Sequence, residues 1–161
     1  MYNVLFLCSD NSARSQMAEC ILNRAAKGRF QAYSAGSRPA DALHPESVAL
    51  LSRLNYSTAA LRTKSWDEFA NPDAPHMDFI FTLCDEIAGE KCPNWPGQPM
   101  TAHWGIPDPA ATTGTPAEKA AKRAEIFRVL DTWIGLFTCL RMDGLDRLAL
   151  KNRLDTIGHG E

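Results

Sequence analysis

Cys8 and Arg14 have residue types and a spacing suited to chemistry on an oxyanion, within the segment CSDNSARS at residues 8–15. An arginine presents a two-pronged donor that matches a tetrahedral oxyanion. Backbone N–H groups at a helix start attract negative charge, and the same field favours the thiolate form of a cysteine. A thiolate beside a bound oxyanion is a nucleophile in position to attack it. The pattern therefore predicts Cys8 as nucleophile and an oxyanion-binding loop made of Ser9, Asp10, Asn11, Ser12, Ala13, Arg14 and Ser15.

A second pair of cysteines, Cys84 and Cys92, lies eight positions apart in a stretch that contains Gly89. A flexible connection would let Cys92 move toward Cys84, and we expect the neighbouring Lys91 to favour its thiolate. The pair is interpreted as redox-active, with two unrelated thiols or a metal site as alternatives. A metal site lacks further ligands at sensible spacing, so none is predicted. The remaining cysteines, Cys20 and Cys139, follow apolar helical patterns and are predicted to pack in the core.

A candidate general acid, Asp108, lies between Pro107 and Pro109. Two prolines stiffen the chain around it and keep it out of a helix. A carboxyl group held over a bound oxyanion can give a proton to a leaving oxygen. The alternative is an ordinary turn aspartate.

Hydrophobic periodicity supplies the elements that must position these residues. Strands are predicted at 4–7, 30–35, 78–84 and 100–104, and helices at 13–26, 45–55, 116–140 and 145–157, with 85–109 mostly a long ordered loop. This alternation is typical of a doubly wound α/β domain, in which ligands bind at the carboxyl ends of the strands. Cys8 and Cys84 each end a predicted strand, so we expect them at the same edge of the sheet.

Length and charge narrow the class of protein. The chain has 161 residues and a formal net charge of -2, which indicates one domain over 1–161 with a helical tail at 142–161, and argues against a nucleic-acid binder. No apolar run approaches the roughly 20 residues of a membrane span, and no signal peptide is recognisable, so we expect a cytoplasmic protein.

The motifs together resemble a known family. VLFLC at 4–8, NSARSQMAE at 11–19, SAG at 34–36 and DP at 108–109 are similar to the low-molecular-weight protein tyrosine phosphatase superfamily, and in particular to the arsenate reductases of that fold. The similarity runs from residue 3 to about 140. It implies a three-layer α/β fold with a four-stranded parallel sheet and helices on both faces.

The resemblance also implies roles for single residues. Asp108 becomes the general acid, Asn11 and Ser15 support the loop, and Ser34 is a hydrogen-bonding partner of Asn11. Glu19 matches a position associated with a monovalent cation.

For the reductases, the resemblance implies a relay of three cysteines. Cys8 attacks arsenate, Cys84 attacks Cys8 and releases arsenite, and Cys92 then forms a disulfide with Cys84. An external thiol reductant, thioredoxin or glutathione with glutaredoxin, restores the thiols; no tightly bound cofactor is implied. The spacing departs from the thioredoxin-coupled members by one extra residue between Cys84 and Cys92.

The sequence thus favours an arsenate reductase in arsenical detoxification, monomeric and acting on arsenate and other tetrahedral oxyanions, with no nucleic-acid or membrane partner. The first alternative is a phosphatase of the same fold that works through a phosphocysteine. Those phosphatases carry tyrosines after the acid, whereas Pro109 is followed by AATT. The second alternative is a non-catalytic oxyanion-binding or redox-sensing module, which would not need Asp108.

Overall fold

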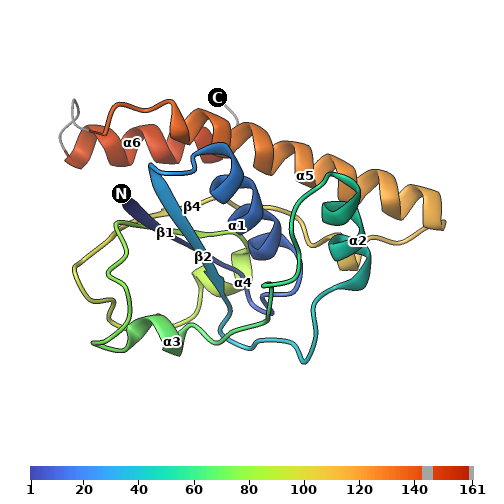
Figure 1. Cartoon of the computed structure of the whole chain (residues 1–161), viewed down its shortest axis with the longest axis horizontal. Helices are drawn as coiled ribbons and strands as arrows, with labels where there is room; N and C mark the ends of the chain where they lie inside the picture. Colours follow the sequence, from blue (N-terminus) through green and yellow to red (C-terminus); the bar gives the residue numbers. More distant parts are fainter. Residues whose placement is uncertain (143–146, 160–161) are drawn as a thin grey trace.

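The computed structural model describes residues 1–142 and 147–159. Within them, four strands form one parallel sheet in the order β2-β1-β3-β4, with helices on either side (Figure 1). The strands are β1 (Tyr2–Leu7), β2 (Phe30–Ala35), β3 (Phe79–Thr82) and β4 (Met100–His103). The helices are α1 (Arg14–Ala25), α2 (Pro45–Arg53), α3 (Asp67–Ala70), α4 (Asp85–Ala88), α5 (Pro116–Thr138) and α6 (Arg147–Gly158), with a 3-10 turn η1 (Pro109–Ala111).

The predicted fold class is confirmed, as are the predicted strands and longer helices, with small shifts at their ends. The start of the helix predicted at 145–157 lies outside the described residues, and the rest corresponds to α6. The short helices α3 and α4 were not predicted. In particular, residues 85–88 form a helical turn where a loop was expected, because acidic Asp85 and Glu86 suit the first turn of a helix and Gly89 follows its end.

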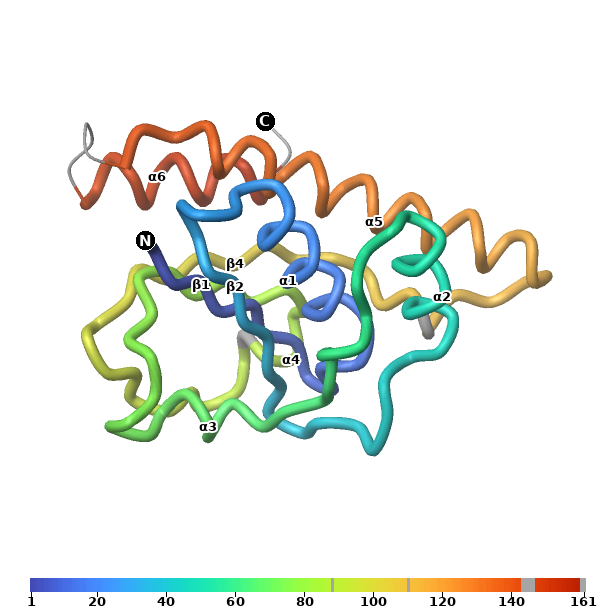
Figure 2. Tube along the Cα trace, viewed as in Figure 1, coloured from blue at the N-terminus to red at the C-terminus, as the bar shows by residue number. Residues whose placement is uncertain are grey.

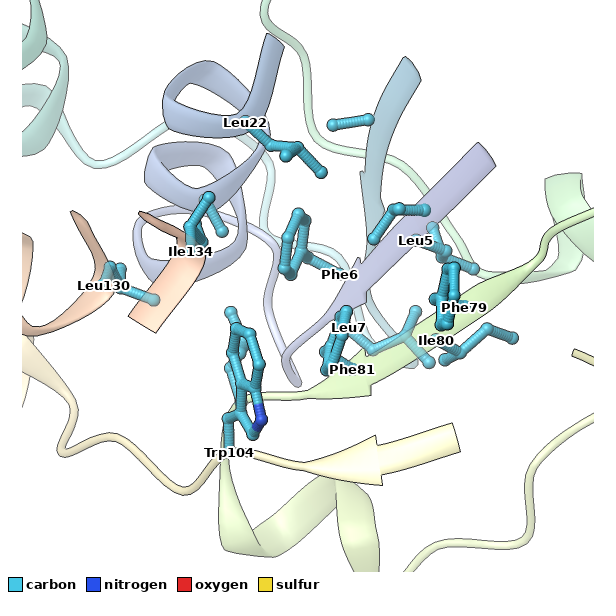
Figure 3. Packing of buried hydrophobic residues seen from close by; sticks show 14 of the residues in the cluster. Leu5, Phe6, Leu7, Leu22, Phe79, Ile80, Phe81, Trp104, Leu130 and Ile134 are labelled. Atoms are coloured by element: carbon cyan, nitrogen blue, oxygen red, sulfur yellow. The ribbon is translucent and has the colours of Figure 1, made fainter. Parts of the chain in front are cut away.

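One face of the sheet carries the largest aromatic cluster. Phe6 stacks on Phe81 in the neighbouring strand, with ring centroids 5.5 Å apart, and Phe137 of α5 packs edge-on against Phe81 at 5.1 Å. Figure 3 shows Phe6 pointing toward Leu22 of α1 and Ile134 of α5. Helices α1 and α5 therefore cover this face, and burial of these side chains is the main stabilising term of the fold.

The opposite face follows the other set of alternating residues. Leu5 lies beside Tyr33 and Ile80 in the parallel register. Phe69 of α3 packs against the Tyr33 ring at a centroid distance of 5.5 Å. Because Thr82 and His103 are register partners on this same face, the carboxyl ends of β3 and β4 bring them together on the side where α4 begins.

Strand β4 lies at an edge of the sheet, and α6 packs along it. The buried indole Nε1 of Trp104, directly after β4, donates to the Leu154 carbonyl of α6 at 3.0 Å. Figure 2 shows α5 and α6 running side by side along one border of the molecule. None of the described helices is both long and apolar enough to span a bilayer.

Candidate active site

The segment from Cys8 to Arg14 joins the carboxyl end of β1 to the first turn of α1. It turns tightly, with Asn11 in the left-handed region at φ 53°. Gly36, directly after β2, lies against it so closely that a Cβ there would be 2.6 Å from the Ser9 carbonyl and 2.7 Å from the Cys8 carbonyl. The loop therefore depends on a residue without a side chain at position 36.

The carbonyl groups of the loop are occupied by hydrogen bonds from outside it. The backbone N–H groups of Arg38, Ala40 and His44 donate to the carbonyls of Ser9, Asp10 and Ser12 at 2.9–3.0 Å. The Gln16 side chain donates to the Asn11 carbonyl at 2.8 Å. Because four successive carbonyls bond to groups outside the loop, the loop N–H groups other than that of Ser12, which donates to Asp10, are left to form the cradle that an oxyanion needs.

Cys8 is fully buried at the base of this loop, and its Sγ lies 2.9 Å from Ser15 Oγ. Asn11 Nδ2 donates to the same hydroxyl oxygen at 2.7 Å, so the hydroxyl hydrogen is available to the sulfur. Burial raises the pKa of the Cys8 thiol, although Ser15 and Arg14 act to lower it. Burial, which the sequence argument did not include, thus opposes the thiolate that the helix terminus and Arg14 favour.

Arg14 is buried and directed toward the loop that follows β4. Its NH1 donates to the Ile106 carbonyl at 2.9 Å, and its NH2 lies 3.9 Å from Asp108 Oδ2. The structure thus brings Arg14 and Asp108 together from positions far apart in the sequence. They border a pocket of about 290 Å³ that is also lined by Asp85, Glu86, Gly105, Ile106 and Pro107.

Ser34 does not take the place that the resemblance implied. Asn11 Oδ1 accepts from the backbone N–H of Lys64 at 2.9 Å, whereas Ser34 Oγ contacts Glu19 Oε1 and Lys64 Nζ, each at 3.3 Å. Ser34 acts on the loop only through Lys64.

Glu19, the position associated with a cation, lies 4.0 Å from the ammonium group of Lys64. Burial raises the pKa of Glu19 and lowers that of Lys64, and each partner offsets part of the other's shift. Among residues 1–142 and 147–159, Glu19 included, no three His, Cys, Asp or Glu side chains gather as a metal site would require.

Cys84 is fully buried next to the loop, and its Sγ lies 3.3 Å from Ser9 Oγ. The expectation that Cys8 and Cys84 share one edge of the sheet is confirmed. Cys92 is exposed and lies near the Glu90 carbonyl, with its Sγ at 3.8 Å from that oxygen. Partial burial and the Glu90 charge raise the pKa of Cys92, so the predicted thiolate-favouring effect of Lys91 is wrong.

Sequence reasoning missed three supports of the loop: Gly36, Gln16 and Lys64. Gln16 also donates to the Arg62 carbonyl at 2.8 Å and so ties the loop to a distant segment. Gly36 belongs to the SAG motif at 34–36, which contributes to the family resemblance, but the sequence alone indicated no role for it. Nothing local marks Lys64, which follows the loop by some fifty positions in the chain.

Comparison with known proteins agrees with this geometry. Residues 3–136 match the family described as low molecular weight phosphotyrosine protein phosphatase. The chain is 35% identical to the arsenate reductase of Bacillus licheniformis over 119 residues, which are 73% of this chain and 81% of that protein. Among solved structures, an arsenate reductase from Archaeoglobus fulgidus has a TM-score of 0.61 at 30% identity, covering 82% of this chain and 98% of that one. A thioredoxin-dependent arsenate reductase from Corynebacterium glutamicum has a TM-score of 0.56 at 25% identity, covering 84% of this chain and 63% of that one.

Proposed function

This chain belongs to the low molecular weight phosphotyrosine protein phosphatase family, and from that premise we propose that it is an arsenate reductase that uses Cys8, Cys84 and Cys92 in turn. The observation that carries the proposal is a second thiol at the oxyanion loop. Cys84 Sγ lies 3.3 Å from Ser9 Oγ, beside the loop that holds Cys8. A phosphatase needs one nucleophile and an acid, whereas a reductase must also supply two electrons.

In the first step, the loop amides and Arg14 bind arsenate, and the Cys8 thiolate forms a sulfur–arsenic bond. One arsenic–oxygen bond breaks, and the oxygen leaves as water with a proton from Asp108. Asp108 is suited to this role because its carboxylate lies 3.9 Å from the guanidinium that would hold the oxyanion.

In the second step, the Cys84 thiolate attacks Cys8 Sγ. The sulfur–arsenic bond breaks and its electron pair stays on arsenic, so arsenic(V) becomes arsenic(III) and leaves as arsenite. A Cys8–Cys84 disulfide remains. Cys92 then attacks Cys84 Sγ, which releases the Cys8 thiolate and forms a Cys84–Cys92 disulfide.

The last step needs an external thiol. The Corynebacterium relative depends on thioredoxin. We propose a thioredoxin-type dithiol for this chain, with glutathione and glutaredoxin as the alternative, and a role in the cytoplasm in arsenical detoxification. Exposure of Cys92 supports this step, because a protein reductant must reach the disulfide.

The phosphatase alternative shares Cys8, Arg14 and Asp108 with the reductase. The described residues that line the pocket at Arg14 and Asp108 include no aromatic side chain to stack on a phosphotyrosine ring. Slow hydrolysis of small phosphate esters is compatible with the site, and it would leave the cysteines reduced.

The test is disulfide mapping by mass spectrometry. Fully reduced protein is mixed with arsenate without oxygen or added thiol, with phosphate as the matched control. We expect a Cys84–Cys92 disulfide with arsenate alone, and no disulfide in Cys8→Ser. A Cys8–Cys84 disulfide that goes no further would overturn the role of Cys92, and unchanged thiols with both anions would overturn the reductase.

A further inference from the structure

A carboxylate lies inside the loop that is to bind an anion. Asp10 Oδ1 accepts a hydrogen bond from the backbone N–H of Ser12 at 3.2 Å. The same oxygen is the acceptor for the Cys8 thiol at 3.8 Å. One N–H of the cradle is thus already engaged, and the group that engages it is negatively charged.

The charges around Cys8 indicate how this carboxylate would affect a bound anion. Arg14 of α1 supplies the positive charge that faces the thiol, and it already lies 3.9 Å from Asp108 of the loop after β4. Asp10 adds a second carboxylate, from the loop itself. The Cys8 thiol is therefore acted on by the positive charge of Arg14 and by the negative charge of Asp10, and the charge of Asp10 opposes that of an anion bound beside the thiol.

We propose that Asp10 is a specificity-determining residue that makes the oxyanion loop favour singly charged over doubly charged oxyanions. The repulsion between a carboxylate and a bound anion grows with the charge of the anion. A dianion is therefore penalised more than the monoanion of the same shape. This inference rests on the proposed function, because it assumes that the loop binds arsenate and related oxyanions.

The charge of Asp10 is felt at the nucleophile. It contributes to the raised pKa of Cys8, although burial is the larger cause. Asp10 is only partly buried, so water screens its charge in part. We therefore expect an effect of about tenfold on affinity, between that of an exposed pair and that of a fully buried one.

A purely structural role for Asp10 makes a different prediction. A side-chain oxygen that accepts from the N–H two residues later shapes many tight turns, and Asn does this as well as Asp. Asp10→Asn therefore keeps the acceptor and removes only the charge, whereas Asp10→Ala removes both. Comparing the two variants separates the effect of the Asp10 charge from the effect of the turn that its side chain stabilises.

The experiment measures inorganic phosphate binding by calorimetry at pH 6 and pH 8, in a Cys8→Ser background so that the thiol does not titrate. Adding Asp10→Asn should tighten phosphate binding by about tenfold at pH 8, where phosphate is mostly a dianion, and by less at pH 6. Adding Asp10→Ala should tighten it less than Asn at both pH values, because the turn is lost.

Equal or weaker phosphate binding by Asp10→Asn, or an equal gain at both pH values, would overturn the charge selection while leaving the oxyanion site intact. Absence of phosphate binding in Cys8→Ser itself, with the protein folded by circular dichroism, would instead overturn the oxyanion loop of the proposed function and this inference with it.

Discussion

Two regions at the carboxyl ends of the strands carry the cysteines of the proposed relay: the loop at 8–15, and the segment from Cys84 to Cys92. The fold holds these two regions in place in different ways. The loop at 8–15 is buried except at the half-buried Ser9 and Asp10, and hydrogen bonds reach it from the segment at 38–44, from Gln16 and from Lys64. The segment between Cys84 and Cys92 is held by Ile87, which is buried in the core, and by two ion pairs, Asp85 to His103 at 2.8 Å and Glu90 to Arg38 at 3.7 Å. The proposed oxyanion site is therefore preorganised, whereas the residues on either side of Ile87 are held mainly by side-chain ion pairs and can move at a smaller cost.

This difference matches what each region must do in the proposed relay. The loop must present its donors with little rearrangement when the oxyanion binds. The exposed Cys92, in contrast, must reach a Cys84 that is fully buried, and a disulfide requires the two Cα atoms within about 7 Å of each other. We therefore predict that substitutions in the loop affect every step of the proposed relay. Substitutions in the segment between Cys84 and Cys92 should affect only the formation of the Cys84–Cys92 disulfide.

The largest expected effect that separates the regions comes from Cys92→Ala. The first arsenate should be reduced at close to the normal rate, and turnover should then stop after about one arsenite per protein. The measurement is a burst experiment that counts arsenite with thioredoxin and its reductase present. Cys139→Ala is the matched control and should turn over normally, because Cys139 is an exposed free cysteine and the prediction that it packs in the core is wrong. Continued turnover by Cys92→Ala would mean that an external thiol resolves Cys84 directly.

Gly36→Ala should break the loop itself. Its Cβ would meet two backbone carbonyls at 2.6 and 2.7 Å, and neither can move without opening the loop. We expect a loss of about 2 kcal/mol of stability and at least about tenfold weaker phosphate binding. Gly135→Ala in α5 is the control, because nothing lies within 4 Å of the added Cβ and helical propensity favours Ala. Denaturant unfolding measures the stability of both variants, and calorimetry measures their phosphate binding. Equal results for the two variants would show that the close approach of position 36 to the loop carbonyls is dispensable.

The contrast between these two regions also shows what sequence can and cannot predict. The order of strands and helices follows from hydrophobic periodicity, which is local, and the strand–loop–helix context of Cys8 is local too. The contacts that Gly36 and Lys64 make with the loop, and the bond from Gln16 to the Arg62 carbonyl, arise when segments distant in the chain meet. No pattern within a window of residues encodes such a meeting.

Desolvation is the other quantity that sequence reasoning lacked. The helix start and Arg14 suggested a thiolate at Cys8, and Lys91 suggested one at Cys92. In each case the fold adds burial, which reverses the direction of the pKa shift, and for Cys92 the charge of Glu90, two residues away in the sequence, acts in the same direction. Neighbours in sequence predict charge, but only the packed structure shows how much water is lost.

Ser15→Ala tests the loop through its pH dependence. The Ser15 hydroxyl lowers the pKa of Cys8 against the effect of burial, so its removal raises that pKa further. A thiol with a higher pKa has less thiolate below that pKa, so the acid limb of the single-turnover rate should move to higher pH. The rate near neutral pH should fall about tenfold and recover at alkaline pH. A decrease of equal size at every pH would show that Ser15 only supports the loop.

The smallest expected effect concerns the contact between His103 and Asp85, which helps to hold the segment between Cys84 and Cys92 in place. His103 Nε2 lies 2.8 Å from Asp85 Oδ1, and its Nδ1 lies 2.7 Å from Thr82 Oγ1, so the end of β4 holds the first residue after Cys84. Because Asp85 must shift if Cys92 is to reach Cys84, His103→Asn should speed formation of the Cys84–Cys92 disulfide about threefold and leave the first arsenate reduction unchanged. Quenched-flow disulfide mapping measures the rate. His76→Asn, before β3 at the opposite end of the sheet, is the control. If His103→Asn instead slowed the first reduction, the imidazole would belong to the preorganised loop, and the division between the two regions would lie elsewhere.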